Sequence, residues 1–96
     1  MYTIETLRSI LSPIAKRHGV KKLSVFGSVA RGEATDESDV DLLVDIPDGW
    51  GLFALGGLYS EIDDALICRV DLVTTGIDDK KFLENIQRDE VIIYEQ

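Results

Sequence analysis

Apolar residues recur along the chain at the spacings typical of helices and strands. A period of three to four residues predicts helices, and short apolar runs bounded by glycine, proline or polar residues predict strands. The predicted helices cover residues 4–18, 52–66 and 79–88, and the predicted strands cover residues 22–26, 39–46, 68–73 and 91–94. The expected order is α-β-β-α-β-α-β. Within the first helix, Pro13 predicts a kink, or a second helix start with Ser12 as its cap.

The run over residues 39–46 is the clearest strand because apolar residues occupy every second position. One face carries Val40, Leu42, Val44 and Ile46, and the other carries Asp39, Asp41, Leu43 and Asp45. The polar connection over residues 27–38 is expected to join two antiparallel strands. The strands over residues 39–46 and 68–73 are joined through a helix, so we expect them to be parallel, with a right-handed crossover. The sequence thus predicts an α/β (α+β) fold, a small mixed sheet with helices packed on it, in a single domain spanning residues 1–96.

The sequence also predicts where two groups of apolar side chains lie, one in the last helix and one in a glycine-rich segment. In the last helix, Phe82, Leu83 and Ile86 are expected to face the sheet. The glycine-rich segment over residues 48–57 carries Trp50 and Phe53, which either pack beside the sheet or form a docking patch for a partner.

The charge balance narrows the classes of ligand. Eighteen Asp and Glu against ten Lys and Arg give a net charge of −8. This charge disfavours direct nucleic-acid binding and leaves metal ions, metal-bound nucleotides and basic protein surfaces as partners. The single cysteine, Cys68, excludes a disulfide scaffold and is typical of the reducing cytoplasm. No apolar run reaches the roughly 18 residues of a membrane span, and residues 1–11 lack a signal-peptide pattern, so we expect a cytoplasmic protein with no membrane partner.

Three aspartates on two predicted strands are the strongest candidates for chemistry. Asp39 and Asp41 are two apart on a strand, so both side chains leave the same face with Cα atoms about 6.6–6.8 Å apart. Asp71 follows the same alternation on the neighbouring strand and is expected on that face. Clustered carboxylates repel unless a cation or a proton binds. Oxygen ligands favour Mg²⁺ or Mn²⁺, and two Mg²⁺ ions are usual for phosphoryl transfer. The alternative interpretation is a solvated face of an acidic protein.

The turn Gly27–Ser28 directly follows a predicted strand. Glycine lets the backbone approach a ligand closely, and the following N–H groups can point at a phosphate. Arg31, one helical turn later, could reach a phosphate or a partner. The alternatives are an ordinary strand-ending turn and a surface arginine.

These residues together resemble a known motif. Gly27-Ser28, ten residues, and Asp39-Val40-Asp41 match the G-S-x10-D-x-D motif of the polymerase-β-like nucleotidyltransferases. The longer string FGSVARGEATDESDVDLLVDI, the helix that ends at Gly19 and the RVDLV strand resemble the minimal nucleotidyltransferases (MNT), the antitoxin halves of HEPN/MNT toxin–antitoxin pairs. The resemblance covers nearly the whole chain.

The resemblance implies the nucleotidyltransferase fold and a Mg²⁺-dependent protein adenylyltransferase (AMPylation) activity. AMP from ATP would pass to a tyrosine hydroxyl of a partner HEPN-family ribonuclease toxin, with release of diphosphate. Asp39, Asp41 and Asp71 match the catalytic, metal-binding aspartates, and Asp71 also helps to activate the nucleophile. Gly27 and Ser28 match the turn that grips the triphosphate of the nucleotide, and Arg31 is assigned to the nucleotide by its spacing from Ser28.

Other functions stay open at this stage. The chain could be an antitoxin that neutralises its toxin by binding alone, or a nucleotidyltransferase that acts on a small molecule or an RNA end. An aspartate-dependent phosphatase normally needs a larger sheet and a distant lysine. Because 96 residues leave little chain for an acceptor pocket, we expect the acceptor to bring its own recognition surface, and the acidic charge suits a basic protein.

Overall fold

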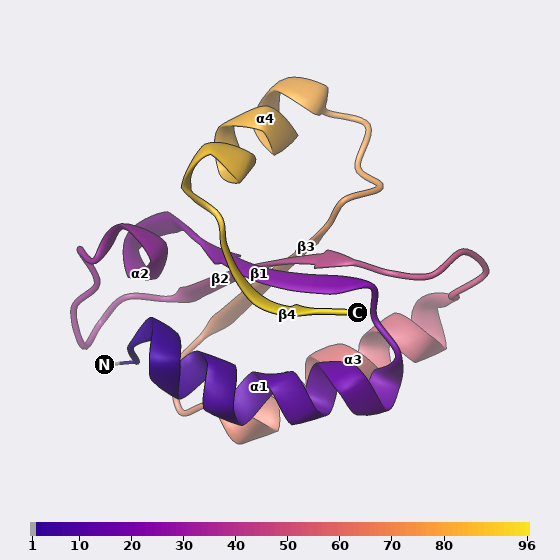
Figure 1. Ribbon diagram of the computed structural model, residues 1–96, viewed down its shortest axis with the longest axis horizontal. Coiled ribbons are helices and arrows are strands. Elements are labelled where there is room, and N and C mark those ends of the chain that lie inside the picture. The colour runs from indigo at the N-terminus through magenta and orange to yellow at the C-terminus, as the bar shows by residue number, and fades with distance from the viewer. Residues whose placement is uncertain (1) are drawn as a thin grey trace.

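A computed structural model of the chain describes residues 2–96 (Figure 1). The described residues form, in chain order, α1 (Ile4–His18), β1 (Lys22–Phe26), α2 (Gly27–Arg31), β2 (Val40–Asp45), α3 (Leu52–Ala65), β3 (Val70–Thr74), α4 (Lys80–Asp89) and β4 (Val91–Glu95). The predicted order and fold class are confirmed, with one addition. The connection over residues 27–38, predicted without regular structure, begins with the five-residue helix α2.

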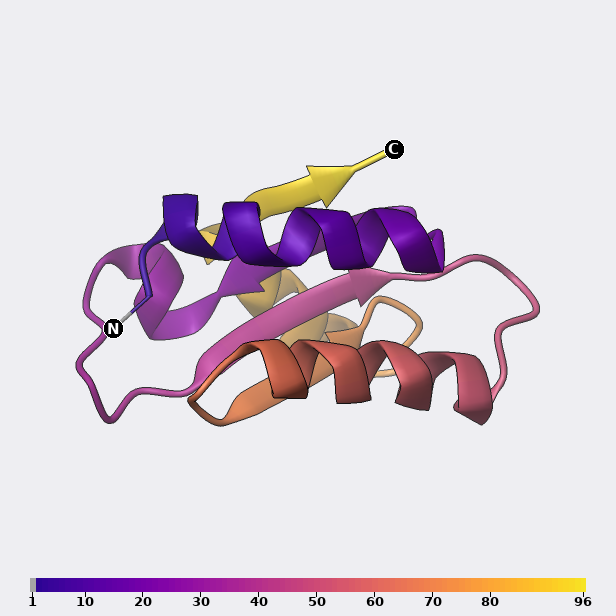
Figure 2. The same cartoon turned by 90° about the horizontal axis from the view of Figure 1, so that it is seen from below.

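The four strands form one mixed sheet in the order β3-β2-β1-β4. Strand β1 pairs antiparallel with both β2 and β4, whereas β2 and β3 run parallel, as the α3 crossover between them predicts. Figures 1 and 2 show α1 and α3 side by side on one face of the sheet and α4 on the other. The sheet therefore has one face covered by two helices and one face covered only in part.

Helix α1 is continuous across Pro13, so the predicted second helix start is wrong. The Thr3 side chain accepts a hydrogen bond from the Thr6 N–H at the start, and Gly19, at φ +77°, ends the helix. Ser12 is not a cap, because its hydroxyl donates to the Ile93 carbonyl at 3.1 Å. Arg8 Nη2 donates to the Ile92 carbonyl at 2.8 Å, so two side chains of α1 bind neighbouring carbonyls of β4.

The main core lies between the sheet and the α1–α3 layer. The face predicted to be apolar is the buried one, since Val40, Leu42 and Val44 are each almost completely buried. The helices supply the opposing side of this core with Leu7, Leu11, Ile14, Leu58 and Ile62. This packing fixes which side chains of β2 face away, and those include the aspartates.

The opposite face has a smaller buried group under α4. Ile86, Leu43 and Ser24 are buried there, but Phe82 is 46% exposed, so its predicted inward position is wrong. Because α4 is short and covers one part of this face, the starts of β2 and β3 keep polar surroundings.

The two aromatic residues of the glycine-rich segment have separate environments. Trp50 is partly buried against the main core, as one of the two alternatives predicted. Phe53, at the start of α3, is 98% exposed and does not belong to the core. Among residues 2–96, no helix is both long and apolar enough to cross a membrane.

Candidate active site

The parallel pairing of β2 and β3 places Asp41 directly beside Asp71. Paired residues on neighbouring strands share a face and lie about 4.8 Å apart across the strands. Both are the second residue of their strand, and both lie on the face opposite the main core. Asp39 stands just before β2, where the Val40 N–H donates to the Arg69 carbonyl at 2.9 Å and continues the pairing. The register agrees with the predicted placement of Asp41 and Asp71 on one side of the sheet, and it does not include Asp39.

The pKa of Asp41 is raised by its burial and by the neighbouring aspartates. Burial raises the pKa of the Asp41 carboxyl, and the charge and hydrogen-bonding proximity of Asp71 raise it further, followed by the charge of Asp39. Arg31 acts in the opposite direction on the pKa of Asp41. The carboxyl group thus carries an unfavourable negative charge that a bound cation would relieve.

Gly27 lies against the carboxylate of Asp41. Phe26, the last residue of β1, pairs with Asp41, so the next residue passes beside the aspartate side chain. A Cβ atom on Gly27 would lie 2.4 Å from Asp41 Oδ2 and 3.3 Å from its Cγ, and the backbone has φ +73°. Only glycine fits both the conformation and the space. The sequence predicted close approach of this turn to a ligand, and the structure shows close approach to a carboxylate.

Ser28 is the second residue of α2, which starts directly at the end of β1. The residue before the helix, Phe26, makes no side-chain capping hydrogen bond. The first N–H groups of α2 therefore begin beside Asp41 without a side-chain acceptor at the cap. This is the place where the sequence predicts that Gly27 and Ser28 hold phosphate groups.

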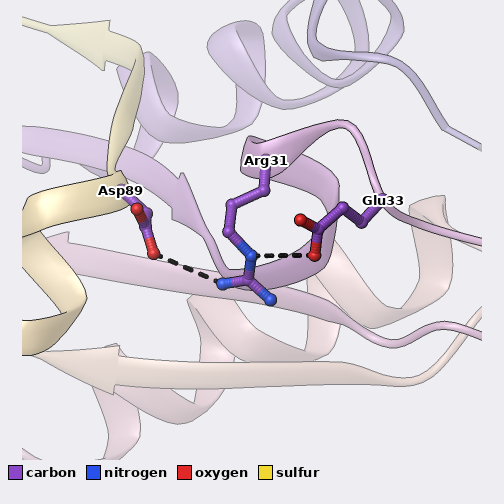
Figure 3. A network of polar contacts seen from close by, with 3 residues as sticks. All are labelled: Arg31, Glu33 and Asp89. Carbon is purple, nitrogen blue, oxygen red and sulfur yellow. Dashed lines mark hydrogen bonds and ion pairs between the residues drawn. The ribbon is translucent and has the colours of Figure 1, made fainter.

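Arg31 is held by two acids, as Figure 3 shows. Its Nε donates to Glu33 Oε2 at 3.1 Å, and its Nη1 donates to Asp89 Oδ2 at 3.3 Å. The contact with Asp89 links α2 to the end of α4. Sequence reasoning missed both partners. Asp89 is 58 positions from Arg31 and leaves no local pattern, whereas Glu33 is only two residues away and was overlooked.

Two further residues lie at the edge of this site. The Arg69 guanidinium lies 4.0 Å from Asp71 Oδ1, on the same side of β3 as predicted. Cys68 is partly buried, and burial raises the pKa of its thiol, which keeps it protonated at neutral pH. Both observations agree with simple structural roles.

The donor set fits a hard divalent cation only in part. Among residues 2–96, no three carboxylate, histidine or cysteine side chains are placed so that they could hold one ion. A pair of neighbouring carboxylates, Asp41 and Asp71, is nevertheless sufficient for Mg²⁺, which usually keeps several waters and binds one or two carboxylates together with substrate phosphates. The raised pKa of Asp41 supports this fit, since the residue is crowded by negative charge.

The structure places paired carboxylates at the start of two parallel strands, beside a glycine turn that opens a helix, which is the arrangement that the resemblance to nucleotidyltransferases predicts. Residues 9–96 match the family described as polymerase beta, nucleotidyltransferase. The chain belongs to this family, and the predicted family and fold are confirmed.

Individual proteins of known sequence or structure are also similar to this chain. Protein adenylyltransferase MntA of Thermococcus cleftensis is 42% identical over 77 residues, which cover 76% of this chain and 78% of that protein. A solved structure described as a minimal nucleotidyltransferase is 36% identical, with a TM-score of 0.78 over 94% of this chain and 95% of that one. A chain from the complex of the tri-AMPylated Shewanella oneidensis HEPN toxin with its MNT antitoxin shares the fold, with a TM-score of 0.73 at 16% identity over 98% of this chain and 74% of that one.

Proposed function

We propose that this protein is an antitoxin that transfers AMP from ATP to a tyrosine hydroxyl of a HEPN-family ribonuclease toxin, in the presence of Mg²⁺. The observation that carries the proposal is the register that pairs Asp41 with Asp71, with Gly27 packed against Asp41. The similarity to a protein adenylyltransferase and the fold shared with a chain of the complex of an AMPylated HEPN toxin with its MNT antitoxin support the acceptor class.

The reaction needs a deprotonated acceptor and a stabilised leaving group. A tyrosine hydroxyl has a pKa near 10 and is a weak nucleophile at neutral pH. When bound, Mg²⁺ lowers the pKa of an oxygen nucleophile and neutralises phosphate charge. Asp41 and Asp71 would hold the metal, whereas Asp39, the third predicted ligand, does not form one metal-binding group with them in the described residues. The new bond joins the acceptor oxygen to the α-phosphorus, and the bond from the α-phosphorus to the bridging oxygen breaks to release diphosphate.

The other steps, proton removal and orientation of the triphosphate, are assigned to residues of this chain. The Asp71 side chain is 47% exposed, so an acceptor can reach it, and it takes the proton of the attacking hydroxyl. The Gly27–Ser28 turn orients the triphosphate through backbone N–H groups at the start of α2. Arg31 adds positive charge on the same side of the site, held in place by Glu33 and Asp89.

A labelling experiment tests this proposal. The chain is incubated with Mg²⁺, the HEPN-family protein from its own genome, and ATP labelled either at the α- or at the γ-phosphate. Only the α-label is expected on the acceptor. Asp41→Asn and Asp71→Asn should each abolish transfer. Asp45→Asn is the matched control, because Asp45 lies on the same face of β2 but away from the site, where it accepts a hydrogen bond from Thr75 at 3.2 Å.

The other candidate functions predict different results. Transfer of the γ-label would indicate a kinase, and a label on RNA would indicate an RNA-end nucleotidyltransferase. If Asp41→Asn and Asp71→Asn still neutralise the toxin in cells, neutralisation proceeds by binding alone, and the enzymatic proposal is wrong.

A further inference from the structure

Strand β3 is an outer strand of the sheet, and β2 is its only neighbour among the described strands. The Arg69 carbonyl and the Thr75 N–H both bond to the backbone of β2, at 2.9 and 3.0 Å. Because successive strand residues direct their backbone groups to opposite sides, Val70, Leu72 and Thr74 direct theirs away from β2. The Val70 carbonyl accepts a hydrogen bond from a side chain of α3 at 3.5 Å. Leu72 and Thr74 therefore form a short open edge that can pair with another strand.

An apolar groove of about 250 Å³ adjoins this open edge. Leu72 of β3 lines it together with one side of α3, and no residue of β2 belongs to the lining. The residues of α3 have the spacing of a single helix side and are Leu52, Leu55, Gly56 and Tyr59. Leu52 is 88% exposed and Tyr59 is 40% exposed, so solvent reaches the groove. Figure 2 shows α3 on the β3 side of the sheet, away from β4.

A strand added at the open edge would be aligned with both the groove and Asp71. The residue opposite Leu72 shares its face of the sheet and lies about 4.8 Å away, so its side chain points to the α3 side, where the groove lies. The residues before and after it point to the other face. One of them lies opposite Asp71, whose side chain is 47% exposed. An extended segment on β3 thus inserts one side chain into the groove and presents its neighbour to the candidate active site.

We propose that the acceptor protein docks as an extended segment along the open edge of β3, with an apolar side chain in the groove and the acceptor tyrosine next to it in sequence. The inference rests on the proposed function, which assigns the proton of the tyrosine hydroxyl to Asp71. Backbone groups of Leu72 and Thr74 supply the hydrogen bonds, and the groove selects the apolar side chain. A second copy of this chain is the other candidate occupant, and it is disfavoured because two chains of net charge −8 repel each other.

Two adjacent glycines of α3 provide a matched pair for the test. Gly56→Leu fills the groove, and the new Cβ would have nothing within 4 Å. Gly57→Leu adds the same side chain outside the groove lining, where the Cβ would meet only His18 Cε1 at 4.0 Å, an ordinary contact. Both changes favour the helix equally, and thermal unfolding checks that the variants fold. Thr74→Pro removes one outward N–H from the edge, where an outer strand tolerates proline.

Binding of the HEPN-family protein from the same genome is measured by calorimetry without nucleotide. Gly56→Leu and Thr74→Pro should each weaken binding about 10- to 100-fold, because the groove or the edge is no longer available. Gly57→Leu should bind as the natural protein does. Equal weakening by the two leucine variants, or no weakening by Gly56→Leu, would overturn the inference. It is also overturned if the natural protein sediments as a dimer that Gly56→Leu and Thr74→Pro convert to monomers, since the edge then pairs with a second copy.

Amide hydrogen exchange measured by NMR tests the strand pairing itself. The N–H groups of Leu72 and Thr74 should exchange at least about 10-fold more slowly in the complex, because both become hydrogen-bonded. Unchanged exchange at both positions in a complex that does form would contradict docking along β3. Because neither measurement requires transfer, the docking mode can be confirmed even if no AMP is transferred, in which case only the enzymatic proposal fails.

Discussion

Replacement of Gly27 by alanine tests the close approach between the glycine turn and Asp41. At φ +73°, an alanine costs about 1–2 kcal/mol of backbone strain. Its Cβ would also meet Asp41 Oδ2 at 2.4 Å, well inside van der Waals contact, so the carboxylate has to move. A displacement of about 1 Å at a catalytic group can cost about 100-fold in rate. We therefore expect Gly27→Ala to lower the rate of AMP transfer about 100-fold.

Gly32 provides the control at the other end of the same helix. It has φ +74°, and a Cβ there would have nothing within 4 Å. Gly32→Ala should therefore carry the same strain without displacing Asp41. For a domain of this size, a loss of 1 kcal/mol lowers the melting temperature by about 4–8 °C. Both variants should melt earlier by a similar amount, and only Gly27→Ala should lose activity.

The assay is the initial rate of transfer from α-labelled ATP to the HEPN-family protein, measured well below the melting temperature of both variants. Circular dichroism gives the melting temperatures. Equal rate losses in the two variants would show that strain alone limits activity. A fully active Gly27→Ala protein would refute the argument that this position holds Asp41 in place.

Four further outcomes follow from the structure. In metal-free buffer, Asp41→Asn should raise the melting temperature at pH 7 and change it less near pH 4. Because the folded-state pKa of Asp41 is raised, ionisation costs stability as the pH rises above the unfolded value, and calorimetry in EDTA at both pH values measures it. Adding Mg²⁺ should raise the melting temperature of the natural protein more than that of Asp71→Asn, as a thermal-shift titration would reveal; equal shifts would argue against binding at this pair. Asp89→Asn should cost less than about 1 kcal/mol in urea denaturation, because the ion pair with Arg31 is half exposed on both sides. Leu11→Ala should cost about 2–5 kcal/mol in the same experiment, since Leu11 is fully buried, and a smaller loss would mean that the core rearranges around the missing side chain.

The sequence predicted which side chains of β2 face the core, because apolar residues alternate along the strand and the apolar face is the one that is buried. The apolar positions from Val40 to Val44 determined the face, and burial of that face left Asp41 on the other. The parallel pairing with β3 followed from the helix between the two strands. Both inferences depend on local pattern and on general rules of connection, so they needed no knowledge of distant contacts.

The features that were missed depend on tertiary structure. Helix α2 has five residues and buries only Val29, which is too little for a helical period to show. Pro13 is tolerated because it lies on the exposed side of α1, where the carbonyl of Ser9 can bind water instead of the missing N–H. The partners of Arg31 and the half-exposed position of Phe82 depend on where α4 packs, which sequence spacing does not specify.

The contacts of Arg8 and Ser12 with the carbonyls of β4 have a consequence for self-association. Outer strands of a sheet attract strands of other molecules and so promote aggregation. Because α1 already supplies donors to Ile92 and Ile93, β4 offers fewer free acceptors to an incoming strand. Any extension of the sheet by a second molecule would then be favoured beside β3, the other outer strand.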